Sequence, residues 1–133
     1  YGVLSHHSAD VRRYRGRPPL VWQYINNEPE FGWTLQQLNN KLDGGKPVVI
    51  KHTNIERTDT FWDIHLKGKE LHPKLLTEGI KQIIEGQFNP KQPNQLGRLT
   101  HSSDKQKWSV VLRILGKNWL SRLLKIGKCV VNK

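Results

Sequence analysis

The stretch Ser5-His6-His7-Ser8-Ala9-Asp10-Val11-Arg12-Arg13-Tyr14-Arg15-Gly16 decides how this chain is interpreted. It follows a short apolar run, and together they predict a buried strand over residues 1–5 that leads into a polar, basic loop over residues 6–17. Asp43 stands 36 residues after His7, in the Gly-rich turn Lys41-Leu42-Asp43-Gly44-Gly45. A histidine at the end of one strand and a carboxylate in such a turn can meet at one edge of a sheet. His7 and Asp43 are therefore the candidate reactive pair.

The bulk composition describes a small basic domain. With 133 residues the chain is long enough for one domain with a modest core. It has no apolar run of the roughly 18 residues that a membrane span requires, and its start is too polar for a signal peptide. The single cysteine, Cys129, excludes an internal disulfide and fits a reducing, cytoplasmic location. The chain begins with Tyr1 and contains no methionine, so we expect a piece of a longer protein.

Charge favours partners that carry phosphate or many negative charges. The formal net charge is +11, and the sequence pI is about 10.1. Such a balance suits nucleotides, RNA or anionic lipid. Residues 104–133 contain eight Lys or Arg against one Asp, so much of the excess lies in this tail.

The sequence pattern predicts one helix followed by two strands between residues 18 and 51. Pro18 and Pro19 are expected to open a helix that ends near Asn26, since proline is tolerated in the first turn. Strands are expected over residues 31–38 and 47–51, like the arms of a hairpin around Asp43.

The second half of the chain is expected to form two helical segments joined by a linker. Thr60 and Asp63 have the spacing of a capping box, and a helix is expected over residues 60–86, split near Pro73. Residues 87–103 have no strong period and are interpreted as a linker. Asp104 is expected to cap a basic amphipathic helix over residues 104–133. One face of this helix carries Trp108, Val111, Leu112, Leu115, Trp119 and Leu123.

Several of these segments resemble the folate-dependent formyltransferases, a family that includes the phosphoribosylglycinamide, methionyl-tRNA and sugar-amine enzymes. The resemblance is carried by His7, the runs Arg13-Tyr14-Arg15-Gly16, Gly32-Trp33-Thr34 and Leu42-Asp43-Gly44-Gly45, and the helix after Pro18. It covers roughly residues 1–86, which would be the C-terminal half of the catalytic domain. The resemblance implies an α/β fold with a mostly parallel, Rossmann-type sheet whose N-terminal half is absent from this chain.

Two departures from the family pattern concern the candidate site. Ser5 stands where the family has an asparagine, and Ala9-Asp10-Val11-Arg12 replaces a Ser-Leu-Leu-Pro segment. A serine hydroxyl can donate a hydrogen bond, but its reach is shorter than that of an asparagine amide.

The resemblance implies transfer of a formyl group from 10-formyltetrahydrofolate to a primary amine, through a tetrahedral species with a negatively charged oxygen. His7 would donate to that oxygen, Asp43 would favour the charged imidazole and help to move the amine proton, and Ser5 would be a second donor. The acceptor could be a glycinamide ribotide, an amino-sugar nucleotide or an aminoacyl-tRNA. Contacts to substrate are expected from Arg13, Arg15, Gly16, Leu42 and Gly44.

Other interpretations stay open for these residues. His7 could be a loop histidine bonded to backbone, and Asp43 a turn former before Gly-Gly. The arginines at 12, 13, 15 and 17 could hold a phosphate or be solvated, and Arg15 could order the loop through carbonyl contacts. His6 is expected to be structural, because adjacent strand residues point to opposite faces. Histidine spacing predicts no metal site.

A second function of a different class remains: a catalytically inactive module that binds a polyanion through its basic tail. Ser5 in place of asparagine favours it. The tail could lie on RNA or an anionic membrane, or it could pack Trp108 and Trp119 against the domain or its missing half.

Overall fold

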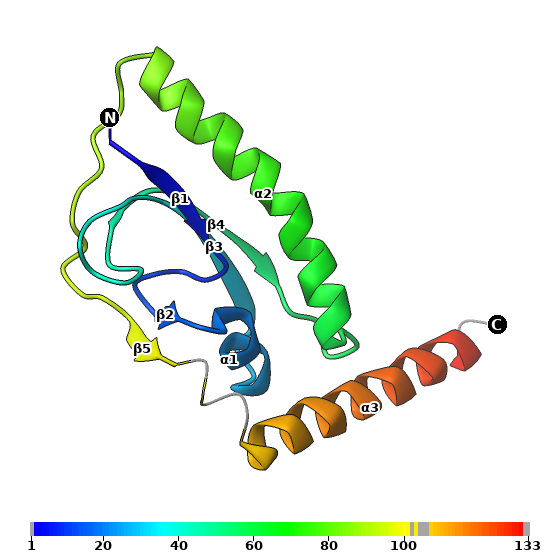
Figure 1. The fold of residues 1–133 in the computed structure, drawn as a ribbon. Helices are drawn as coiled ribbons and strands as arrows, with labels where there is room; N and C mark the ends of the chain where they lie inside the picture. The colour runs from blue at the N-terminus through cyan, green and yellow to red at the C-terminus, as the bar shows by residue number, and fades with distance from the viewer. Residues whose placement is uncertain (1, 102, 104–106, 132–133) are drawn as a thin grey trace.

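The computed structural model describes residues 2–101, 103 and 107–131 (Figure 1). In chain order the elements are β1 (Leu4–His7), β2 (Tyr14–Gly16), α1 (Pro19–Ile25), β3 (Glu30–Gln37), β4 (Lys46–Asn54), α2 (Phe61–Ile84), β5 (Arg98–Thr100) and α3 (Trp108–Val131). Figure 1 shows α2 lying along one side of β1, β3 and β4, whereas α3 runs beneath α1 at the other end. The expected α/β class is confirmed.

The larger sheet is antiparallel, so the prediction of a mostly parallel sheet is wrong for the described residues. Its strand order is β1-β3-β4, and both pairings are antiparallel. The short connection over residues 38–45 permits a hairpin, whereas a parallel pairing needs a crossover of about a dozen residues or more. Parallel pairing occurs between β2 and β5, which lie far apart in the sequence.

Strand β1 covers different residues from those expected. It runs from Leu4 to His7 instead of over residues 1–5, and Val3 is 65% exposed. His6 pairs with Leu35 and His7 with Thr34, so both histidines lie in the strand. Backbone pairing with β3 sets these limits, and pairing does not require apolar side chains.

Residues 87–103 are more than a linker, because they contain β5. Arg15 of β2 pairs with Leu99 of β5, and Thr100 Oγ1 donates a hydrogen bond to the Arg15 carbonyl at 2.9 Å. This strand brings a distant segment against residues 14–16, inside the stretch expected to be a loop.

Helix α2 begins as the sequence predicts and continues through the expected break. The Thr60 side chain accepts from the Asp63 backbone, and the Asp63 side chain accepts from the Thr60 backbone, so the capping box is present. The helix is continuous through Pro73, which is exposed, so water can satisfy the carbonyl that loses its donor there. The helix approaches the sheet closely at Gly79, where a Cβ would lie 2.2 Å from the Leu35 side chain.

The core lies between α1, the α2 side of the sheet and the start of α3. Burying a side chain such as Phe31, which is fully enclosed, contributes about 1.5–3 kcal/mol. The buried apolar residues of the core are Leu20, Val21, Tyr24, Ile25, Phe31, Trp33, Leu35, Val49, Ile64, Leu75 and Val110.

Helix α3 does not pack its predicted apolar face against this core. Trp108 is 80% exposed and Trp119 is 65% exposed, so the interpretation that packs them on the domain is wrong for the described residues. The expected cap, Asp104, lies outside the described residues.

Candidate functional site

The structure brings His7 and Asp43 together. His7 ends β1, and its neighbour His6 points to the opposite face of the sheet, as strand geometry requires. The Nδ1 atom of His7 lies 3.4 Å from Oδ1 of Asp43, with the His7 side chain 7% exposed and the Asp43 side chain 20% exposed. The carboxylate is therefore the more accessible member of the pair.

Asp43 is held by the turn that carries it and by a backbone donor from β2. Its φ is 45°, in the left-handed region that aspartate tolerates better than most residues, and the Gly44 N–H donates to the Lys41 carbonyl at 3.1 Å. The other carboxylate oxygen, Oδ2, accepts from the Gly16 N–H at 3.0 Å. Gly16 has φ 83°, and a Cβ there would lie 1.9 Å from the Thr100 carbonyl oxygen. Strand β5 thus makes glycine necessary at the residue that anchors Asp43.

The hydrogen bonds of His7 determine which ring nitrogen carries the proton. Nε2 lies 3.2 Å from the Tyr14 carbonyl oxygen, which can only accept, so Nε2 is the donor. In the neutral ring Nδ1 is then an acceptor facing Asp43. Burial lowers the pKa of His7, and the opposing effects of the Asp43 charge and the Tyr14 carbonyl do not cancel this shift. The neutral imidazole therefore offers Nδ1 as a place to receive a proton.

Gln36 is a member of the site that the sequence analysis missed. It is fully buried; its Nε2 donates to Asp43 Oδ1 at 3.4 Å, and its Oε1 accepts from the Gly45 N–H at 3.0 Å. Alternation along β3 gives a signal for it, because Thr34 and Gln36 face away from the apolar side of Trp33 and Leu35. Two polar residues on one buried strand face indicate a polar site beneath them.

The arginines of the quoted stretch are engaged within the chain. Arg12 forms a bidentate pair with Asp10, and Arg13 pairs with Glu28. Arg15 donates from Nε to the Gly97 carbonyl at 2.9 Å, which agrees with the interpretation that it orders the loop.

The remaining predicted site residues lie around the Asp43 turn and β1. The Leu42 carbonyl accepts from Arg15 at 3.4 Å, and the Leu42 side chain is 59% exposed. The Gly44 carbonyl accepts from the Asn39 side chain at 2.7 Å. Ser5 pairs in register with Gln36, and its hydroxyl lies 3.5 Å from the carbonyl of His6.

His6 belongs to an aromatic cluster on the α2 side of the sheet. Its ring stacks on Trp33 at 5.8 Å between centroids and lies 4.0 Å from the His72 ring. Burial lowers the pKa of His6, and the nearby His72 adds to this effect. These contacts are what a structural role requires.

Two further observations concern metal binding and membrane spans among the described residues. Their histidine, cysteine, aspartate and glutamate side chains form no group of three or more that could hold a metal ion. Among the same residues, no helix combines the length and hydropathy that crossing a bilayer demands.

Comparison with known proteins places this geometry in context. No family model matches the chain. The methionyl-tRNA formyltransferase of Caldanaerobacter subterraneus is 32% identical over 91 residues, which are 68% of this chain and 29% of that protein. The chain spans 29–31% of the length of the curated relatives it matches first.

Solved structures share the fold over most of the chain. The formyltransferase PseJ from Anoxybacillus kamchatkensis, in complex with a UDP-linked formamido sugar and tetrahydrofolate, matches with TM-score 0.71 and 22% identity, covering 86% of this chain and 65% of that one. An N-formyltransferase from Helicobacter canadensis, in complex with folinic acid and dTDP-3-aminofucose, matches with TM-score 0.71 and 21% identity, covering 90% and 47%.

Proposed function

Because this chain belongs to the formyltransferase family, we propose that it forms part of an enzyme that transfers a formyl group from 10-formyltetrahydrofolate to a primary amine. The acceptor would be a glycinamide ribotide, an amino-sugar nucleotide or an aminoacyl-tRNA, and the reaction would take place in the cytoplasm. The observation that carries the proposal is the His7–Asp43 pair, in which a partly exposed carboxylate faces a buried imidazole.

The carboxylate of this site suits the attack of an amine on a formyl group. The folate would supply the formyl group as a substrate, and PseJ and the Helicobacter enzyme were crystallised with folate compounds. On this chain, the requirement is a group that takes a proton from the attacking amine. Asp43 meets it, because its carboxylate is reachable and is anchored through Oδ2 by the Gly16 N–H.

His7 would complete the proton-accepting site. Its Nε2–H is bound to the Tyr14 carbonyl, which leaves the Nδ1 lone pair 3.4 Å from Asp43 Oδ1. A proton taken from the attacking amine would be held between His7 Nδ1 and Asp43 Oδ1, since both atoms can accept it. It would then pass to the folate nitrogen as the bond from that nitrogen to the formyl carbon breaks. Donation by His7 to the formyl oxygen, as the family resemblance implies, would require Nε2 to exchange the Tyr14 carbonyl for that oxygen. Proton holding at Nδ1 needs no such rearrangement.

The test is formyl transfer by the full-length protein of which this chain would form part, from 10-formyltetrahydrofolate to a panel of phosphorylated amines, comparing wild type with Asp43→Asn and His7→Gln. Loss of a positioned acid–base group costs about 10²–10⁴-fold in rate, so each variant should lose kcat on this scale. The matched control is His52→Gln, because His52 also faces a carboxylate, with Nε2 3.2 Å from Asp10 Oδ2. Turnover that survives both site variants would remove His7 and Asp43 from the mechanism.

The same assay distinguishes the enzyme from a second candidate function, an inactive module that binds a polyanion through residues 104–133. Ser5 favours it, because its hydroxyl is near the His6 carbonyl and stands at the family's asparagine position. A folded protein with no turnover on any amine would support this candidate.

A further inference from the structure

Helix α3 is attached to the rest of the domain, here called the body, through the buried side chain of Val110 near its start and through its polar side chains. Two of its cations donate to the carbonyls that end α1: Arg113 to Ile25 at 2.7 Å, and Lys117 to Tyr24. Further along the helix, the Asn118 side chain accepts from the Tyr24 hydroxyl at 2.9 Å and the Phe61 N–H at 2.8 Å, Ser121 donates to the Arg57 carbonyl at 3.2 Å, and Lys125 donates to Asp63 at 2.7 Å.

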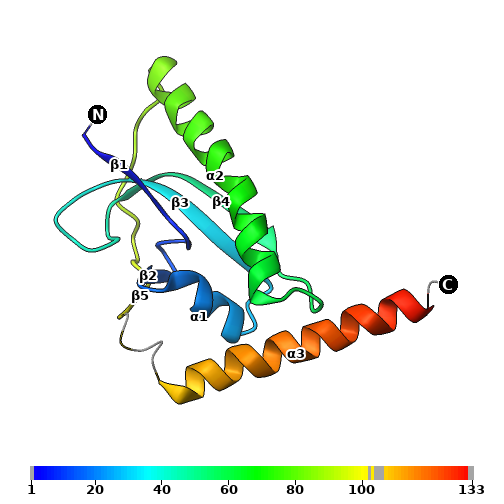
Figure 2. The ribbon, with the colours of Figure 1, turned by 45° about the vertical axis from the view of Figure 1, so that its right-hand side comes forward.

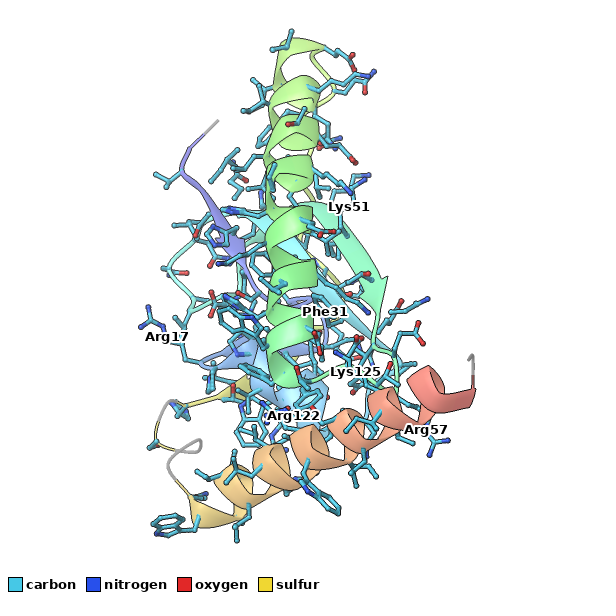
Figure 3. All side chains as sticks on the ribbon, turned by 90° about the vertical axis from the view of Figure 1, so that its right-hand side faces the viewer. Arg17, Phe31, Lys51, Arg57, Arg122 and Lys125 are labelled. Atoms are coloured by element: carbon cyan, nitrogen blue, oxygen red, sulfur yellow. The ribbon has the colours of Figure 1, made fainter. Side chains whose placement is uncertain are left out.

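The opposite side of α3 is apolar and faces away from the body. Spacings of three and four residues place six large apolar side chains along one side, and each is between 44% and 80% exposed. We call them the outer stripe: Trp108, Leu112, Leu115, Trp119, Leu123 and Ile126. Figure 2 shows α3 running beneath α1 and extending past the rest of the molecule, and in Figure 3 side chains point away from the body along its outer edge. A contiguous apolar surface of this kind marks an interaction site.

Charge decides which partner fits this surface. The α3 sequence contains five Lys or Arg residues and no Asp or Glu. Two copies packed stripe to stripe would place two such helices side by side, and their like charges would repel. A nucleic acid would engage the cations, yet Arg113, Lys117 and Lys125 point to partners in the body, and the outward surface is apolar.

We propose that α3 lies in the interface of an anionic lipid bilayer, with the outer stripe at the boundary between headgroups and acyl chains. An apolar stripe with tryptophan, on a helix whose charges are all positive, is the composition of interfacial helices. Anionic headgroups attract the net positive charge of the helix. The exposed Arg122 lies beside Trp119 and Ile126 by helical spacing, so its side chain can extend toward the headgroups. The polar contacts that α3 makes with α1 and α2 would then hold the rest of the domain at the membrane surface. This surface is independent of the formyl-transfer proposal, because it uses no residue of the His7–Asp43 site.

Cosedimentation of the 133-residue chain with vesicles tests the proposal. The vesicles would be phosphatidylcholine alone, or phosphatidylcholine with about 30% phosphatidylglycerol. We expect binding to the anionic vesicles to be about tenfold tighter or more, and to weaken as salt is raised. The variant Leu112→Ser/Trp119→Ser should lose about tenfold or more in affinity, because it removes two anchors from the stripe.

A matched control changes equally exposed residues on α2. Trp62 is 61% exposed and Ile84 is 79% exposed, so Trp62→Ser/Ile84→Ser removes similar apolar area elsewhere and should leave binding within about twofold. Circular dichroism would show that both variants are folded.

Three results would overturn the proposal. The first is equal loss of vesicle binding in the stripe variant and the control variant. The second is no vesicle binding by wild type together with self-association that the stripe variant abolishes, which would assign the stripe to a second copy. The third is binding to a homopolymeric RNA, unchanged in the stripe variant, without binding to vesicles.

Discussion

Replacing Gly16 by alanine adds a Cβ atom at a residue that has two roles. Its N–H anchors Asp43, and its backbone pairs with β5. Gly16 has φ 83°, which an alanine adopts at a cost of about 1–2 kcal/mol. The new Cβ would also stand 1.9 Å from the Thr100 carbonyl oxygen, so the backbone of one strand must move. Overpacking of this kind costs typically about 1–3 kcal/mol.

The two effects together predict a loss of about 2–5 kcal/mol in the free energy of unfolding. This is a large share of the roughly 5–15 kcal/mol that a domain of this kind has in total. Moving the Gly16 N–H would also weaken its 3.0 Å hydrogen bond to Asp43, so the proposed formyl transfer should fall even in the fraction that stays folded.

Gly86 provides the control for backbone strain. Its φ is 67°, and a Cβ there would meet no atom within 4 Å, so Gly86→Ala carries only the conformational cost. Urea unfolding of wild type and both variants would measure the difference, which should be about 1–3 kcal/mol. If Gly16→Ala loses no more stability than Gly86→Ala, the contact with β5 does not hold the Asp43 anchor in place, and the reasoning fails.

Two further predictions concern stability alone. Thr60→Ala removes the capping box of α2 and should lower the free energy of unfolding by about 1 kcal/mol in urea titration, whereas Thr77→Ala on the exposed side of α2 should not lower it. Because burial holds the pKa of His7 below its ordinary value of 6.5, the unfolded chain binds more protons as the pH falls through that value. Stability should therefore be level above about pH 7.5 and decline toward about pH 5. His7→Gln should make this decline shallower, and the lowered pKa of His6 accounts for the rest; an unchanged slope in that variant would contradict the assignment.

The candidate site could be found from the sequence because its parts are marked locally. A histidine near a strand end, a Tyr-Arg-Gly run and an aspartate before two glycines each have their own signal, and their spacing joins them. Gln36 and the Tyr14 carbonyl could not be assigned in this way, because a buried glutamine and a backbone oxygen become part of the site only through strand register. The proton position on His7 depends on that register as well.

The sequence by itself determined the features that depend on a few neighbouring residues. These are the capping box at Thr60, the proline start of α1 and the hairpin around Asp43, and in each case contacts between residues close in the sequence decide the local geometry.

The tertiary structure decided the features that depend on distant partners. Strand direction, the pairing of β5 with β2 and the continuity of α2 through Pro73 all depend on which segments meet. The clearest case is α3, whose periodicity shows an apolar side but not which way it faces. Asn118 accepts hydrogen bonds from Tyr24 and Phe61, and Arg113 donates to the Ile25 carbonyl. These bonds hold the polar side of α3 inward, so the apolar side faces outward.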